Sequence, residues 1–343
     1  MKRAAITGIA GQDGTYLARH LLRQGYEVHG LLQFPFDQEV VGLRQRFSPE
    51  EMDTVRWYNG SLEDPFSMVR FLKAGQPDEI YHLAGLSDSR HSFHVPEESV
   101  LSITLGTLRL LEATRELCPN ARVFLASSAE VFGVPAQTPQ DENTLMRPFT
   151  PYGIAKLAAD QFGRLHREKY GQFVSVGILY NHESPLRPAN YLSRKVARAV
   201  AAIKQGKQHE LQLGGLDAER DWSDARDFVR GFWLTLQAQA PSEFVFASGT
   251  SRKVADLVEC AFNTAGLDYR KFVKVTQSNS DAQQVATGLC GNPRKAENEL
   301  GWKREWTFQQ TVEDLVRAEL EDRPMVRRSD PTPARVEAKG CAT

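Results

Sequence analysis

The first 32 residues carry the feature that most restricts the fold of this chain. A short apolar strand at residues 4–7 runs into a turn at residues 8–14 that contains three glycines, and apolar side chains then recur at helical spacing over residues 16–22. A second apolar strand follows at residues 28–32. A glycine-rich turn between a strand and a helix places backbone N–H groups where a pyrophosphate can bind. This unit therefore predicts a dinucleotide-binding domain.

Strands and helices continue to alternate along the first half of the chain. The pattern indicates strands at residues 55–58, 79–84, 123–128 and 174–179, and helices at residues 67–73 and 101–117 and after Pro151. Such alternation favours the α/β class, with a Rossmann-like doubly wound parallel sheet covered by helices on both faces. Ligands of such sheets bind beyond the carboxyl ends of the strands, where residues 8–14, 83–87 and 127–130 would converge.

The second half is less regular and predicts a smaller mixed α/β lobe that binds substrate. Helices are expected at residues 192–205, 225–237 and 254–265, with strands near Leu211 and at residues 244–247. We therefore divide the chain into a Rossmann domain at residues 1–180, to which some later segments return, and a lobe that spans mainly residues 181–322. The polar stretch 323–343 is expected to be a disordered tail.

Composition excludes several classes of partner. The net charge is −1 and the isoelectric point is about 6.7, so neither nucleic acid nor an anionic membrane is expected as a partner. No run of 18 apolar residues is present, and the N-terminus lacks the layout of a signal peptide. The four cysteines are scattered without a CxxC pattern, which favours free thiols over a disulfide framework or a metal site. We therefore expect a cytoplasmic protein without a bound metal.

A tyrosine and a lysine lie four residues apart at the start of the helix after Pro151. Tyr152 and Lys156 would share one face of that helix, one turn apart. A phenol with its usual pKa of about 10 is a poor base at neutral pH. A neighbouring ammonium group favours the phenolate and would lower that pKa. The pattern alone is more often a surface tyrosine and a solvated lysine, so it needs support from other residues.

That support comes from the end of the strand at residues 123–128. A Ser128 hydroxyl could share a hydrogen bond with a substrate oxygen and the phenol, and a Glu130 carboxylate could remove a C–H proton made acidic by a neighbouring ketone. Taken singly, Ser128 could be a capping residue and Glu130 an exposed turn residue. With the glycine turn and the Tyr152–Lys156 pair, the functional interpretation is favoured.

Several longer motifs resemble one family along nearly the whole chain. The glycine turn has GxxGxxG spacing, which is typical of extended short-chain dehydrogenases, and contains a distinctive Gln-Asp pair. The chain resembles the GDP-mannose 4,6-dehydratase family in six segments: residues 7–17, 127–133, 150–156, 181–187 with 193–195, 213–222 and 291–302. The segments Asn-His-Glu-Ser-Pro and Asp-Ala-Glu-Arg-Asp-Trp are the specific ones, whereas GxxGxxG and YxxxK occur throughout the superfamily.

The resemblance implies a self-contained redox cycle on a nucleotide-linked hexose. Tyr152, assisted by Lys156 and Ser128, would take the proton of the C4 hydroxyl while the C4 hydride passes to the nicotinamide. The resulting 4-ketone would acidify the C5 proton, which Glu130 would remove as the C6 hydroxyl leaves as water. Hydride would then return to C6, and Tyr152 or Glu130 would return a proton to C5. The product would be a 4-keto-6-deoxy sugar.

The resemblance also assigns ligand contacts. Contacts to NADP or NAD are implied for Gly8, Gly11, Gln12, Asp13, Gly14, Leu83, Ala84, Ser87, Tyr152, Lys156, His182 and Arg187. Contacts to the nucleotide-diphosphate sugar are implied for Ser128, Asn181, Lys195 and Arg220, with Arg187 also reaching the diphosphate. A homodimer built through two helices, one of them carrying Tyr152, or a tetramer, is implied as the assembly.

Three segments depart from the family's pattern. Residues 33–37 replace an Arg-Arg-Ser-Ser run that holds the 2′-phosphate of NADP and reaches a neighbouring subunit, which makes NAD plausible and the tetramer contact doubtful. Ser61 replaces an acidic adenine contact, and residues 281–285 lack a late arginine for the diphosphate. These departures leave the identity of the base and sugar open.

Two alternatives to a 4,6-dehydratase therefore remain. One is a nucleotide-sugar epimerase, a reductase or a differently directed dehydratase of a specialised pathway, and Ala129 fits this alternative because many epimerases have alanine there. The other is a non-catalytic dinucleotide sensor, which would have no need of Ser128, Tyr152 and Lys156. Glu130 discriminates best between these alternatives, because 4,6-elimination requires a base at C5.

Overall fold

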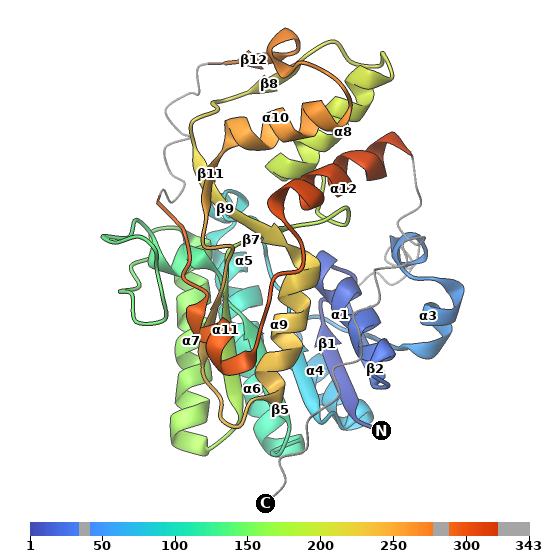
Figure 1. The fold of residues 1–343 in the computed structure, drawn as a ribbon. Coiled ribbons are helices and arrows are strands. Elements are labelled where there is room, and N and C mark those ends of the chain that lie inside the picture. Colours follow the sequence, from blue (N-terminus) through green and yellow to red (C-terminus); the bar gives the residue numbers. More distant parts are fainter. Residues whose placement is uncertain (34–41, 277–287, 322–343) are drawn as a thin grey trace, which may run out of the picture.

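The computed structural model describes residues 1–33, 42–276 and 288–321 (Figure 1). Three sequence predictions lie wholly or largely outside these residues: the tail at 323–343, the segment 33–37 and the segment 281–285. The described chain forms a large lobe around a central sheet and a smaller lobe at one end of that sheet (Figure 1).

The central sheet has seven strands, and every pair of neighbours is parallel. Its strands, in spatial order, are β10 (Glu243–Phe246), β6 (Val174–Leu179), β5 (Arg122–Ala126), β4 (Glu79–His82), β1 (Arg3–Thr7), β2 (Glu27–Leu32) and β3 (Arg56–Asn59). The order β3-β2-β1-β4-β5-β6 is that of a doubly wound nucleotide-binding fold. The predicted fold class is confirmed.

Helices cover both faces of this sheet. One face packs against α1 (Gln12–Arg23), α9 (Ala225–Gln237) and α11 (Arg294–Leu300), and the other against α4 (Pro65–Gly75), α6 (Gly106–Leu117) and α7 (Pro151–Tyr170). Alternate side chains of one strand divide between the two cores: Ala4 and Ile6 join the first, and Ala5 joins the second. This period of two is what a strand buried on both faces produces.

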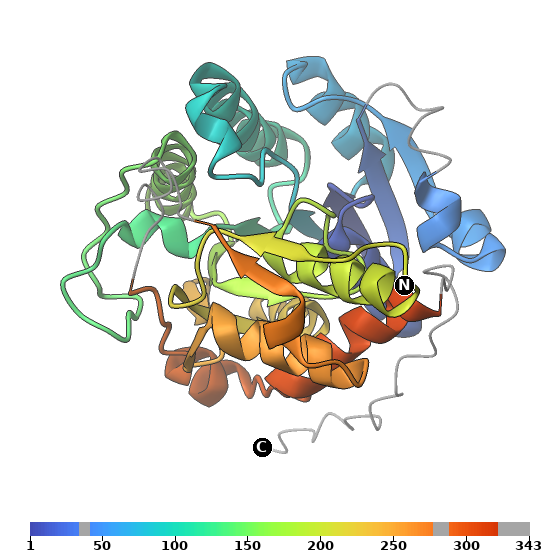
Figure 2. The same ribbon diagram turned by 90° about the horizontal axis from the view of Figure 1, so that it is seen from above.

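The smaller lobe lies over the carboxyl end of the central sheet (Figure 2). It contains a three-stranded sheet, a two-stranded parallel sheet and three helices with a core of their own. Its elements are β7 (Asn181–Glu183), α8 (Leu192–Lys204), β8 (Leu211–Leu213), β9 (Glu219–Asp224), β11 (Ser251–Lys253), α10 (Val254–Thr264), β12 (Val273–Val275) and α12 (Phe308–Leu320). Strand β7 pairs with β9 in parallel, which places residues 181–183 beside residues 222–224.

Short elements fill the connections. They are α3 (Pro49–Thr54), the 3₁₀ helices η1 (His91–Phe93), η3 (Ala129–Phe132) and η4 (Tyr269–Lys271), the helix α5 (Pro96–Ser99) and the π-helix η2 (Val100–Leu105). The helix predicted at residues 101–117 is present, but its first turn is the π-helix, and Ile103 from this turn packs with Tyr152. Helix α3 is fixed by a capping box between Ser48 and Glu51.

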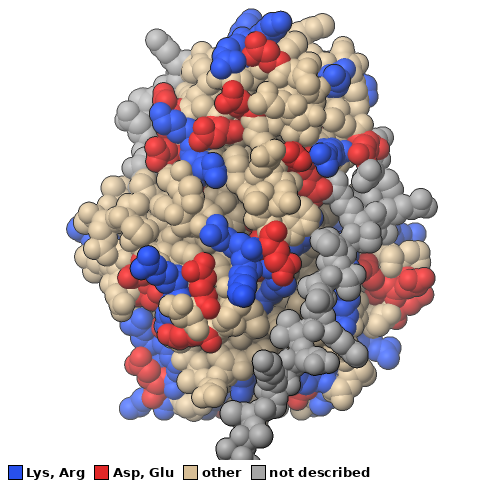
Figure 3. All heavy atoms as spheres, viewed as in Figure 1, with Lys and Arg blue, Asp and Glu red and all other residues tan. Residues whose placement is uncertain are grey.

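Acidic and basic side chains are mixed over the face that Figure 3 shows, in keeping with the net charge of −1. Among the residues that the structure describes, no helix combines the length and the apolar character needed to span a bilayer.

Candidate active site

The glycine turn packs directly against the end of β4. A Cβ atom at Gly8, where φ is +74°, would lie 2.8 Å from the backbone nitrogen of Ala84. A Cβ atom at Gly14 would lie 2.2 Å from the carbonyl oxygen of Gly8. Gly11 is the N-cap of α1 and makes no side-chain cap, so the first N–H groups of this helix remain available to an anion. The turn therefore has the close backbone approach that a pyrophosphate site requires.

The Gln-Asp pair of the turn is bonded to β7 of the smaller lobe. Gln12 Nε2 donates to the carbonyl of His182 at 3.1 Å, and Gln12 Oε1 accepts from the Ser184 hydroxyl at 2.8 Å. Asp13 Oδ2 lies 2.9 Å from His182 Nε2, and His182 Nδ1 lies 2.7 Å from the carbonyl of Tyr180. These three predicted cofactor residues thus join the nucleotide turn to the segment that enters the smaller lobe.

Ser128 follows β5 and caps η3 through an N–H bond from Glu130 at 3.2 Å. Helix α7 begins two residues before Gly153, and Thr150 caps it by accepting from the Gly153 N–H at 2.9 Å. The end of β5 and the start of α7 therefore lie close together, and the Ser128 hydroxyl is near enough to the Tyr152 phenol to lower its pKa. The structure therefore places the predicted serine and tyrosine beside each other.

Lys156 lies on the same face of α7 as Tyr152, as the spacing predicted. Its Nζ atom is 5.8 Å from the centre of the Tyr152 ring and donates to the carbonyl of Ala126 at 2.6 Å. Burial lowers the pKa of Lys156 to about 8. The predicted fall in the phenol's pKa is wrong for this structure: burial raises the pKa of Tyr152 well above 10, and the nearby Ser128 hydroxyl offsets only part of that rise.

Glu130 is half-buried beside this pair. Burial raises the pKa of its carboxyl group, while Ser89, Arg220 and Thr150 act in the opposite direction. One of its oxygens, Oε2, is buried and has no hydrogen-bond partner. A carboxylate with a raised pKa and an uncommitted oxygen has the properties of a general base.

The predicted substrate residues lie on three elements. Asn181 and Arg220 are on the neighbouring strands β7 and β9, and Asn181 Nδ2 donates to the Asp221 carbonyl at 3.4 Å. Burial lowers the pKa of Arg220, and the facing Glu130 carboxylate raises it. Lys195 is exposed on α8 and donates to the carbonyl of Gln212 at 3.2 Å. Arg220 is thus the substrate candidate that the structure brings to the catalytic carboxylate.

Arg187 connects the two halves of the site. Its guanidinium lies 3.8 Å from the centre of the Tyr191 ring and 3.4 Å from a Glu183 oxygen. Burial lowers the pKa of Arg187, but Glu183, Tyr191, Asp13 and Tyr152 together raise it above its ordinary value. The Tyr191 hydroxyl in turn donates to the carbonyl of Ser87 at 2.8 Å.

The remaining predicted cofactor residues lie at the end of β4. The N–H of Leu83 donates to the Thr7 carbonyl at 3.2 Å, and the N–H of Ala84 donates to the Thr7 hydroxyl at 3.3 Å.

Three further residues near the site were not predicted: Tyr191, Ser89 and Thr150. No spacing in the sequence links them to Glu130 or Arg187.

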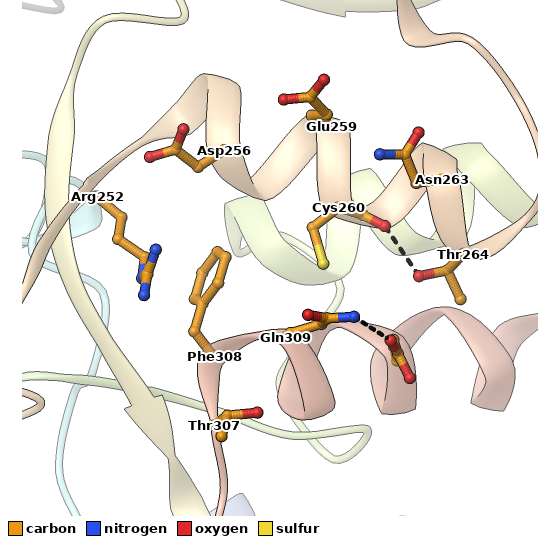
Figure 4. Close-up of a pocket in the computed structure, with 10 residues that line it drawn as sticks. Arg252, Asp256, Glu259, Cys260, Asn263, Thr264, Thr307, Phe308 and Gln309 are labelled. Carbon is orange, nitrogen blue, oxygen red and sulfur yellow. Dashed lines mark hydrogen bonds between the residues drawn. The ribbon is translucent and has the colours of Figure 1, made fainter.

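A separate hollow of about 650 Å³ lies between α10 and α12 in the smaller lobe (Figure 4). Three of its side chains are acidic, Asp256, Glu259 and Glu313, and Cys260 and Phe308 lie between them. None of the predicted site residues lines this hollow.

A doubly wound sheet, a glycine turn at its first strand and a Ser-Tyr-Lys set beyond β5 define an enzyme of the short-chain dehydrogenase/reductase type. Comparison with known sequences narrows this class. A sequence model of the GDP-mannose 4,6 dehydratase family matches residues 5–315. The chain therefore belongs to the GDP-mannose 4,6-dehydratase family, as its motifs predicted.

Individual relatives agree with this placement. A GDP-mannose 4,6-dehydratase of Sinorhizobium fredii (strain HH103) is 38% identical over 344 residues, covering 93% of this chain and 97% of the relative. GDP-mannose 4,6 dehydratase 1 of Arabidopsis thaliana is 37% identical over 327 residues, covering 93% of this chain and 90% of the relative.

Solved structures share the fold at lower identity. RMD from Pseudomonas aeruginosa complexed with NADPH has a TM-score of 0.78 at 22% identity, covering 94% of this chain and all of that one. DesIV, a dTDP-glucose 4,6-dehydratase from Streptomyces venezuelae with NAD and TYD bound, has a TM-score of 0.79 at 22% identity, covering 95% and 99%. At this identity the similarity concerns the fold alone.

Proposed function

We propose that this protein is a nucleotide-sugar 4,6-dehydratase that converts GDP-mannose, or a close relative, to the 4-keto-6-deoxy sugar. The observation that carries the proposal is the Glu130 carboxyl group, which is half-buried, has one oxygen without a partner and faces Arg220. Removal of the C5 proton needs such a base, whereas oxidation and reduction at C4 alone do not.

Each catalytic side chain has a separate task. Tyr152, beside Ser128, takes the proton of the C4 hydroxyl, and the Lys156 ammonium stabilises the phenolate. Glu130 then removes the C5 proton, which the 4-ketone has made acidic, and the C6 hydroxyl leaves as water. Tyr152 or Glu130 finally returns a proton to C5. Because Tyr152 is buried and its pKa is raised, the lysine charge matters most when the phenol must ionise.

NADP or NAD, when bound, supplies the reversible hydride acceptor that this chemistry requires. The glycine turn fits the pyrophosphate, since a Cβ atom at Gly11 would meet only the Gly8 carbonyl, at 3.2 Å, and the space before α1 is otherwise open. Leu83, Ala84 and Ser87 would border the cofactor along the end of β4, and Arg187 would supply positive charge to a phosphate. Gln12, Asp13 and His182 would hold the turn in place around it.

Substrate would lie between the strand ends and the smaller lobe. Asn181 and Arg220 present an amide and a guanidinium on adjacent strands, and Lys195 adds a charge on α8. Such donors suit the diphosphate of a nucleotide sugar. The identity of the base and the sugar is what the experiment below determines.

The surface of α7 supports a homodimer. Ile154 is 52% exposed and Leu165 44% exposed on this helix, and their spacing of eleven residues places both on one face of it. A second copy of α7 would cover both side chains.

The unpaired state of Cys118, Cys260 and Cys290 fits a reducing compartment such as the cytoplasm.

The test is incubation of the purified protein, without added cofactor, with GDP-, UDP-, CDP- and dTDP-sugars. We expect loss of one water and a 4-keto product from a GDP-sugar, with GDP-mannose as the best substrate. A product of unchanged mass would instead identify an epimerase. A reduced product without water loss, in a parallel incubation with added NADPH, would identify a reductase. Bound cofactor without turnover of any sugar would identify a sensor. Each of these three results would overturn the proposal.

A further inference from the structure

One buried carboxylate beside the catalytic pair has no task in the mechanism above. Asp160 lies one helical turn after Lys156 on α7 and is 8% exposed. Its Oδ2 atom accepts a hydrogen bond of 2.5 Å from the hydroxyl of Ser127, the residue that precedes Ser128. Burying a carboxylate costs free energy unless hydrogen bonds or an opposite charge compensate for the lost water.

Two hydrogen bonds tie the end of β5 to α7 at this place. Lys156 donates to the carbonyl of Ala126, and the adjacent Ser127 donates to Asp160. The next residue, Ser128, carries the hydroxyl that lies beside the Tyr152 phenol. Asp160 is therefore part of the contact that sets the distance between the strand end and the helix that carry the catalytic groups.

The groups around Lys156 come from three elements, α7, α1 and β4. Asp160 on α7 and Asp13 on α1 both favour the ammonium form, and Asp160 has the larger effect. The facing residue on β4, His82, is neutral because burial lowers its pKa to about 3. The centre of the Tyr152 ring lies 5.8 Å from the Lys156 Nζ atom. Since Asp13 is already paired with a histidine, Asp160 is the main source of negative charge for the lysine.

The pKa of the Asp160 carboxyl group lies close to neutral pH. Burial raises its pKa to about 7, while the Ser127 hydrogen bond and the Lys156 charge stabilise the anion. Glu243 on β10 raises this pKa and Arg164 on α7 lowers it. The anion thus depends on Ser127, so removal of that hydroxyl should weaken its effect on Lys156.

We propose that Asp160 is a positioning residue that keeps the Lys156 ammonium charged and, through Ser127, holds the end of β5 against α7. The effect on the lysine charge is independent of the reaction. Its catalytic importance rests on the proposed function, in which a charged Lys156 stabilises the Tyr152 phenolate.

The charge on Lys156 can be titrated without turnover. Trace acetic anhydride labels neutral amines only, so the yield of the Lys156 peptide, measured by mass spectrometry from pH 6 to about 11, reports its midpoint. Asp160→Asn should lower that midpoint by about one pH unit, and Ser127→Ala should lower it by a smaller amount. Glu168→Gln is the matched control, because it removes one negative charge from an exposed position of the same helix and should leave the midpoint unchanged.

The pH profile of turnover provides the second measurement. Activity that needs a protonated lysine is lost as pH rises through its pKa, so the alkaline limb of Asp160→Asn should move to lower pH by the same amount. An unchanged midpoint in both Asp160→Asn and Ser127→Ala would overturn the proposal. If Asp160→Asn does not fold, Ser127→Ala decides alone. If no sugar is turned over, the labelling result still stands, so failure of the proposed function can be distinguished from failure of the Asp160 proposal.

Discussion

Replacing Glu130 by glutamine tests the base at C5 directly. The substitution keeps the shape of the side chain and removes its ability to accept a proton, while Tyr152 and Ser128 remain in place. A positioned general base contributes roughly 10²–10⁴-fold to a rate. That range corresponds to about 3–5.5 kcal/mol of transition-state stabilisation. We therefore expect Glu130→Gln to slow water loss by at least about a hundredfold.

The assay follows elimination by mass spectrometry in D₂O, where the product of the native protein should carry deuterium at C5. Glu130→Gln should lose both the mass change and the deuterium, because both depend on removal of the C5 proton. Glu142→Gln is the matched control. Burial also raises the pKa of Glu142, but its carboxylate accepts a hydrogen bond from the Val245 N–H at 2.7 Å and so has a structural role. This control should reduce stability and spare the rate constant. Elimination within tenfold of native in Glu130→Gln would refute the assignment.

Three further outcomes are expected. Tyr152→Phe should lower turnover roughly 10²–10⁴-fold without a change in the circular dichroism spectrum, because the lost hydroxyl takes the C4 proton; native turnover would remove Tyr152 from the mechanism. Arg220→Met should move the acid limb of the kcat/KM profile to higher pH, because Arg220 lowers the pKa of Glu130 and its loss leaves only Ser89 and Thr150 to oppose the effect of burial; an acid limb that stays or moves down would show that the two do not interact. Gly14→Ala should destabilise the fold by about 1–3 kcal/mol in thermal unfolding, because its Cβ atom would lie 2.2 Å from the Gly8 carbonyl oxygen. Gly215→Ala is the control and should leave stability nearly unchanged, because the space around that Cβ position is open.

The regular part of the fold was predictable because buried parallel strands are apolar throughout and lie between turn residues. The strands expected at residues 4–7 and 174–179 match β1 and β6 to within one residue. Helix α12 was missed although Thr307 and Gln310 form a capping box at its start, a pattern visible in the sequence. Strand β12 was missed for a different reason: its three residues are half-buried or exposed, so they show no apolar pattern.

The proximity of the predicted catalytic residues was predictable, but their electrostatics were not. Four-residue spacing is sufficient to place Tyr152 and Lys156 on one face of a helix. The direction of a pKa shift depends on burial, which arises from packing between distant segments, such as Ile103 against Tyr152. Asp160 shows the same limit, since the spacing from Lys156 was visible but its burial and its bond to Ser127 were not.

The order in which the chain leaves the ribosome gives the sheet a vulnerable interval. Phe124 of β5 stacks on Phe232 of α9, with ring centres 4.5 Å apart, yet α7, β6 and much of the smaller lobe lie between them in the sequence. At the usual 5–20 residues per second, roughly 5–20 s pass before α9 follows β5 out of the ribosome. Until then α1 is the only one of the three helices on this face of the sheet that has been made, and strand β10 cannot yet close the edge of the sheet. The apolar surface that α9 later covers is thus exposed during synthesis, when chaperones can bind it.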